Sequence, residues 1–121
     1  MKYIVITKDP EIKEAATKGL HPDDTTEFYA DWQQGLDGCD GADLLFVDML
    51  ATLDEPGRIA GYENFATSKM RHPIAMDVKV VLISPPEDYE LDFMAGWPNF
   101  VFLHYRRPVD YKIFRRASTW I

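Results

Sequence analysis

Asp48 is the residue of this sequence best placed to do chemistry. It ends the run 43–48, whose four central residues, Leu-Leu-Phe-Val, are all apolar. A short apolar run without alternation predicts a strand buried on both faces, as in parallel sheets covered by helices. Ligands and reactions collect at the carboxyl ends of such strands. The Asp48 carboxylate is therefore our candidate functional group, and a solvated aspartate at a strand end is the alternative.

The elements that must position Asp48 alternate along the chain between strand and helix patterns. Strands are predicted at residues 3–6, 25–30, 43–48, 78–83 and 100–103. Helices are predicted at residues 11–20, 31–39, 59–71, 87–95 and 109–120, with a loop at 49–57. This alternation predicts parallel strands joined by crossover helices. The expected fold is α/β: a doubly wound five-stranded parallel sheet in a flavodoxin-like three-layer α/β/α sandwich.

The size and composition are those of one packed domain covering residues 1–121. The chain is 46% hydrophobic and 13% aromatic, which is typical of a globular protein and not of a disordered tail. Its net charge of −7 argues against nucleic acid as a partner, because phosphate binding needs a basic surface. No apolar run approaches the ~20 residues of a membrane span, and Met1–Ile6 resembles a first strand more than a signal peptide.

The cysteine and histidine content argues against disulfides and against transition-metal sites. Cys39 is the only cysteine, so an intramolecular disulfide and a CxxC zinc site are excluded. His21, His72 and His104 are scattered, without the short spacing of paired metal ligands. We therefore expect no metal site built on these side chains, and a cytoplasmic location.

The residues at the strand ends resemble the receiver domain of two-component response regulators, over nearly the whole chain. In that family the third strand ends on an aspartate that accepts a phosphoryl group. The fourth ends on a serine or threonine that binds a phosphoryl oxygen, and a Lys-Pro pair follows the fifth. Asp48 and Ser84 match the first two positions, and Arg107-Pro108 stands where Lys-Pro is expected.

The sequence departs from the receiver pattern after the first strand, where the family carries an acidic pair that binds Mg²⁺. Thr7 and Lys8 occupy those positions, and the first carboxylate is Asp9. Because Mg²⁺ prefers oxygen ligands with one or two carboxylates, we expect poor magnesium binding and no cofactor. The Lys8 ammonium is expected to pair with Asp48 in place of the metal.

The second departure is the arginine at position 107. A guanidinium is a planar fork suited to bidentate contacts with carboxylates, whereas an ammonium is a compact point charge. We expect Arg107 to hold Asp48 in the ionised state, in a fixed pocket that also includes Ser84. Which of Arg106 and Arg107 points into this pocket stays open.

Three aromatic or histidine residues are candidates for a switch or an interface. His104 and Tyr105 fall near the position of the aromatic switch residue in receivers; either contacts Ser84 or simply caps the sheet edge, and we favour the edge. Trp97 follows the acidic segment 87–94. This segment is either a partner surface or a solvated helix with its apolar side on the sheet.

The resemblance leads to the hypothesis of a stand-alone, atypical receiver, or pseudo-receiver, that is not an enzyme. It would act in signal transduction through protein–protein interaction and without Mg²⁺-dependent phosphorylation. Its expected partners are a histidine kinase or a downstream effector, or a second copy bound through the acidic fourth and basic fifth helices.

Two alternatives stay open. One is a phospho-accepting receiver that uses Asp48 with Asp9 as metal ligand. The other is a small α/β enzyme or ligand-binding protein that uses the crevice at the strand ends. A flavin site is disfavoured, because Thr7-Lys8-Asp9-Pro10 lacks the glycines and hydroxyls of a phosphate loop.

Overall fold

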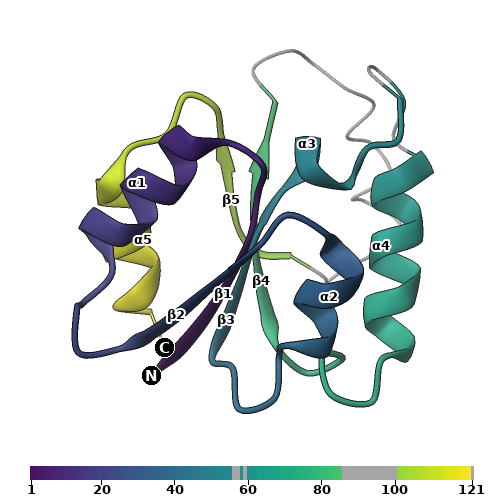
Figure 1. Ribbon diagram of the computed structural model, residues 1–121, viewed down its shortest axis with the longest axis horizontal. Coiled ribbons are helices and arrows are strands. Elements are labelled where there is room, and N and C mark those ends of the chain that lie inside the picture. Colours follow the sequence, from purple (N-terminus) through teal and green to yellow (C-terminus); the bar gives the residue numbers. More distant parts are fainter. Residues whose placement is uncertain (56–57, 59, 86–100, 121) are drawn as a thin grey trace.

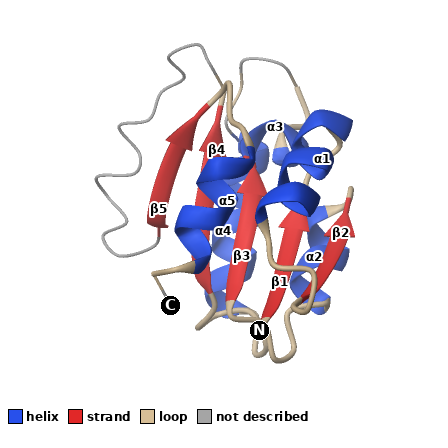
Figure 2. Cartoon of the chain, turned by 90° about the vertical axis from the view of Figure 1, so that its left-hand side faces the viewer, coloured by secondary structure: helices blue, strands red, loops and turns tan. Residues whose placement is uncertain are grey.

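The computed structural model contains a five-stranded parallel sheet with helices on both faces (Figures 1 and 2). It describes residues 1–55, 58, 60–85 and 101–120. The strand order is β2-β1-β3-β4-β5, and every neighbouring pair is parallel. The strands are β1 (Lys2–Ile6), β2 (Thr25–Tyr29), β3 (Leu44–Asp48), β4 (Lys79–Ser84) and β5 (Val101–Arg106). The predicted fold class is confirmed.

The helices form the two outer layers of the sandwich. One face of the sheet is covered by α1 (Pro10–Gly19) and α5 (Tyr111–Ser118). The other carries α2 (Trp32–Asp37), α3 (Met49–Thr52) and α4 (Ala60–Arg71). The helix predicted at 87–95 lies outside the described residues. No helix in the described part of the chain is long and apolar enough to cross a membrane.

The central strand β3 is buried on both faces, as its apolar run predicts. Phe46 packs against Phe114 of α5, with ring centroids 4.9 Å apart. Leu45 and Val47 join the core of the opposite layer, which includes Tyr62 and Phe65 of α4. Because successive side chains of a strand point to opposite faces, one apolar run fills both halves of the core.

Short helix α3 occupies residues 49–52, which we predicted as a loop; that prediction is wrong. Asp48 is the cause, because it has the extended backbone of an N-cap and its side chain accepts a hydrogen bond from the Leu50 N–H. Asp9 caps α1 in the same way through the Glu11 N–H. Asp9 and Asp48 therefore each start a helix that follows the carboxyl end of a strand.

The edge strand β5 reaches its final register through an irregularity. Val80 pairs with Val101, but Val81 pairs with Leu103, so Phe102 is an extra residue in β5. Beyond this bulge His104 pairs with Leu82, and its side chain lies on the same face as Ser84, two residues further along β4.

Candidate functional site

The Arg107 guanidinium joins two carboxylates at the carboxyl edge of the sheet. Its Nη1 donates to Oδ2 of Asp9 over 2.7 Å, and its Nη2 donates to Oδ2 of Asp48 over 2.5 Å. The backbone holds Arg107 in place, since its N–H donates to the Ser84 carbonyl over 2.9 Å. Arg107 therefore points into the pocket, whereas the Arg106 side chain is exposed.

The Asp48 carboxylate accepts hydrogen bonds at both oxygens. Thr7 Oγ1 donates to Oδ2 over 2.8 Å, and the Leu50 N–H donates to Oδ1 over 3.2 Å. The Asp48 side chain is only 2% exposed. Three donors converge on this group, counting Arg107, and this arrangement fits an ionised carboxylate.

The three ionisable groups perturb one another. Burial raises the pKa of Asp48 above its ordinary value, although the charge of Arg107 and the hydroxyl of Thr7 oppose this. The hydrogen bond from Arg107 lowers the pKa of Asp9, which is less buried. Burial works to lower the pKa of Arg107, but its bonds to Asp9 and the charge of Asp48 outweigh burial and raise it. Arg107 is therefore the fixed charge of the pocket.

Lys8 does not contribute to this pocket, contrary to our expectation. Its side chain is exposed, and the hydrogen-bond and ion-pair partners of Asp48 in the described part of the chain do not include it. Strand alternation explains the error. The Thr7 N–H continues the sheet pairing to the Tyr29 carbonyl, so the buried Thr7 faces Asp48 and the next side chain points away.

Ser84 contacts His104. The Ser84 hydroxyl oxygen lies 2.8 Å from Nε2 of His104 on the neighbouring strand. The His104 side chain is exposed overall, but its partial desolvation, together with the charge of Arg106, lowers its pKa. Of the two interpretations considered for His104, the contact with Ser84 is the one present in the structure. Tyr105 is half-buried against the core formed with α1 and α5. Trp97 lies outside the described residues.

Comparison with solved structures places this arrangement in a known fold. A sensor protein from Polaromonas sp. JS666 superposes with a TM-score of 0.70 at 14% identity, covering 98% of this chain and 93% of that one. A response regulator receiver domain protein from Clostridium thermocellum gives 0.65 at 16% identity, covering 99% and 98%. A response regulator in red light signalling of R. palustris gives 0.63 at 12% identity, covering 98% and 90%. This is the receiver fold.

The similarity is structural only. No protein-family model matches the sequence, and no curated protein matches it. At identities of 12–16% the superpositions establish the fold of this chain. What this chain does with the receiver fold depends on the side chains of its own pocket.

The pocket residues do not fit a magnesium ion as they are arranged. Both carboxylates at this edge, Asp9 and Asp48, are bound to Arg107. In the described part of the chain, no three histidine, cysteine, aspartate or glutamate side chains are grouped so as to hold a metal ion. Because the guanidinium already supplies a positive charge between the two carboxylates, a divalent cation would have to displace it.

Proposed function

We propose that this chain is an atypical receiver that acts in signal transduction through protein contacts, with its central pocket fixed by Arg107. The observation that carries the proposal is the double contact of one guanidinium with Asp9 and Asp48. A phospho-accepting receiver needs a free oxygen on the aspartate and a cation to neutralise the incoming phosphoryl group. Here Oδ2 of Asp48 accepts from both Thr7 and Arg107, and Oδ1 accepts from the Leu50 N–H.

The proposed action is binding and not catalysis. The proposed partners are proteins, either a histidine kinase or a downstream effector, in the cytoplasm. Nucleic acid is disfavoured by the net charge of −7. A second copy of the chain is a further proposed partner, because α5 exposes three basic side chains, Lys112, Arg115 and Arg116, in an acidic protein.

The test is a backbone-amide NMR titration with Mg²⁺, followed by beryllofluoride as a phosphoryl mimic. We expect no saturable shift at Thr7, Asp48 or Ser84 in the unmodified protein. The Arg107→Gln variant, which frees both carboxylates, is expected to show a Mg²⁺ response at these positions. A saturable shift of the unmodified protein that requires both Mg²⁺ and the mimic would contradict the proposal.

A second candidate is a phospho-accepting receiver in which Arg107 moves aside. It is favoured by one observation: Asp9 and Asp48 reach the same guanidinium, so their carboxylates converge on one point. Two converging carboxylates are a reasonable start for a magnesium site. Acid-labile phosphate on Asp48, formed with a small phosphodonor and Mg²⁺ and lost in Asp48→Asn, would decide for this candidate.

A further inference from the structure

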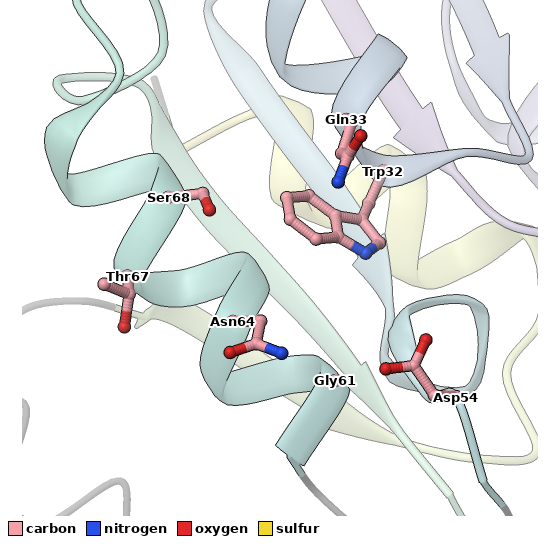
Figure 3. A pocket seen from close by; sticks show the side chains of 7 residues that line it. All are labelled: Trp32, Gln33, Asp54, Gly61, Asn64, Thr67 and Ser68. Carbon is pink, nitrogen blue, oxygen red and sulfur yellow. The ribbon is translucent and has the colours of Figure 1, made fainter.

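A polar groove lies between α2 and α4. Its main cavity has a volume of about 410 Å³. Trp32, Gln33 and Asp54 form one wall, and Asn64 and Ser68 of α4 face the indole from the other (Figure 3). A cavity of this size is in the range of ~300–1,000 Å³ found for small-molecule sites.

The groove continues toward the carboxyl edge of the sheet. A second cavity, of about 280 Å³, shares Trp32 and Asp54 with the first and adds Lys8, Asp31 and Thr52 to the lining. Lys8 follows β1 and Thr52 ends α3. The exposed Lys8 side chain therefore lies at this groove and not at Asp48.

We propose that the groove binds a small organic cation with a planar body, such as an aryl amidine or a benzylic amine. Asp54 is the only charged residue among the described residues that line the main cavity. A cation there would pair with the Asp54 carboxylate while its planar part packs on the Trp32 indole, which also attracts positive charge through its ring. The side chains of Asn64 and Ser68 supply hydrogen-bonding groups opposite.

The walls of the groove are held in position before any ligand binds. Trp32 packs edge-on against Phe65 of α4, with ring centroids 5.8 Å apart and an interplanar angle of 87°. Gly61 lies so close to the Thr52 carbonyl and the Asp54 N–H that a Cβ at this position would meet them. A preformed site loses less entropy on binding, so modest contacts suffice for measurable affinity.

The groove is independent of the Asp48 pocket in its chemistry. Asp48 is buried and its oxygens already accept from Thr7, Leu50 and Arg107, whereas Asp54 is exposed. The net charge of −7 also raises the local concentration of a cation and lowers that of an anion. Cation binding in the groove therefore does not depend on the proposed function of the Asp48 pocket.

The test is an NMR titration with benzamidine, followed at the indole N–H of Trp32, which Trp32→Phe assigns. The neutral isostere benzamide and the anion benzoate are the ligand controls. We expect saturable shifts at Trp32 and Asn64 with benzamidine, and a Kd for benzamide at least about threefold weaker, as for loss of one exposed ion pair. Benzoate is expected to give no saturable shift.

Two variants locate the charge that matters. Asp54→Asn is expected to weaken benzamidine binding at least about threefold. Glu63→Gln removes one negative charge from the exposed surface of α4 without touching the groove, and is expected to leave the Kd unchanged. The proposal is overturned if benzamidine gives no saturable shift at Trp32. It is also overturned if benzoate binds equally well, or if the two variants have the same effect.

Discussion

The guanidinium of Arg107 and the carboxylate of Asp48 form an ion pair of 2.5 Å, with side chains that are 18% and 2% exposed. Such a pair is costly to form, because both charges leave water, and costly to break from one side, because the remaining charge is buried alone. Asp9 is the second counter-charge of Arg107 and is 26% exposed. Removing the charge of Asp48 and removing the charge of Asp9 should therefore lower the free energy of unfolding by different amounts.

Replacing Arg107 by glutamine is expected to cost most. Arg107→Gln leaves Asp48 as an unpaired buried charge, and the free energy of unfolding should fall by about 3 kcal/mol at pH 7. Urea unfolding measures it. Arg116→Gln, an exposed arginine of α5, is the control and should change stability by no more than about 0.5 kcal/mol. Equal effects of the two variants would show that Arg107 does not neutralise a buried charge.

The stability of Arg107→Gln should also depend on pH, and the direction of this dependence is an independent test of the ion pair. Burial already raises the pKa of Asp48, and loss of the guanidinium raises it further. The folded variant then binds a proton more readily than the unfolded chain. Its stability relative to the unmodified protein should therefore recover as the pH falls through the folded-state pKa of Asp48. A deficit that grows on acidification would contradict this account.

Asp48→Asn should cost less than Arg107→Gln. The asparagine side chain leaves Arg107 with Asp9 as its counter-charge. Its single oxygen, in the place of Oδ2, can still accept from Thr7 and Arg107, so only the Leu50 N–H loses its partner. The expected loss is about 1–2 kcal/mol by thermal or urea unfolding. Asp9→Asn is the matched control, because asparagine is as good an N-cap, and should cost under about 1 kcal/mol. An Asp48→Asn protein more stable than the original would refute the fixed ion pocket.

His104 should make folding stability depend on pH near neutrality. Its pKa is lowered in the folded protein by partial desolvation and by Arg106, although the side chain is exposed overall, so the effect should be small. The unfolded chain therefore takes up the proton first, and stability should fall as the pH drops from about 6.5 toward the folded-state pKa. His104→Gln removes the titrating group, and with it this loss of stability on acidification, but keeps a hydrogen-bonding group near Ser84. Urea unfolding at pH 7.5 and 5.5 measures the difference, with His21→Gln, whose side chain is 66% exposed, as control. The same slope in His104→Gln as in the original would refute the assignment.

The sheet could be predicted from the sequence because its signals are local. The sequences of β1, β3 and β4 each contain several consecutive apolar residues, and such a run predicts burial on both faces without knowledge of the neighbouring strands. In the structure these strands are buried on both faces. Helix α3 was missed since four residues are too short to show a helical period. Its only signal was Asp48 itself, an N-cap residue type, which we interpreted only as a strand-end carboxylate.

The site was only partly predictable, because its contacts depend on side-chain direction. The rule for strand ends selected Asp48, the resemblance to receivers selected Arg107, and both lie in the pocket. Alternation along β1, had it been extended by two residues, would have put Thr7 on the same face of the sheet as Asp48 and Lys8 on the opposite face. That Arg107 also reaches Asp9 depends on how two loops from distant parts of the chain approach one another. No pattern within either loop contains that information.

Gly61 fixes the distance between α3 and α4, and its replacement tests that packing. A Cβ at Gly61 would meet the Thr52 carbonyl oxygen, and would lie 3.0 Å from both Asp54 N and Leu53 Cα. All three are backbone atoms, which cannot rotate away, so α4 must shift. Gly61→Ala should lower the free energy of unfolding by about 1–3 kcal/mol, although alanine is the better helix former. Ser68→Ala in the same helix is the control, since Ser68 is half-buried and its change leaves no clash. A Gly61→Ala protein that gains the ~1 kcal/mol expected from helix propensity alone would show that the two helices are not in contact there.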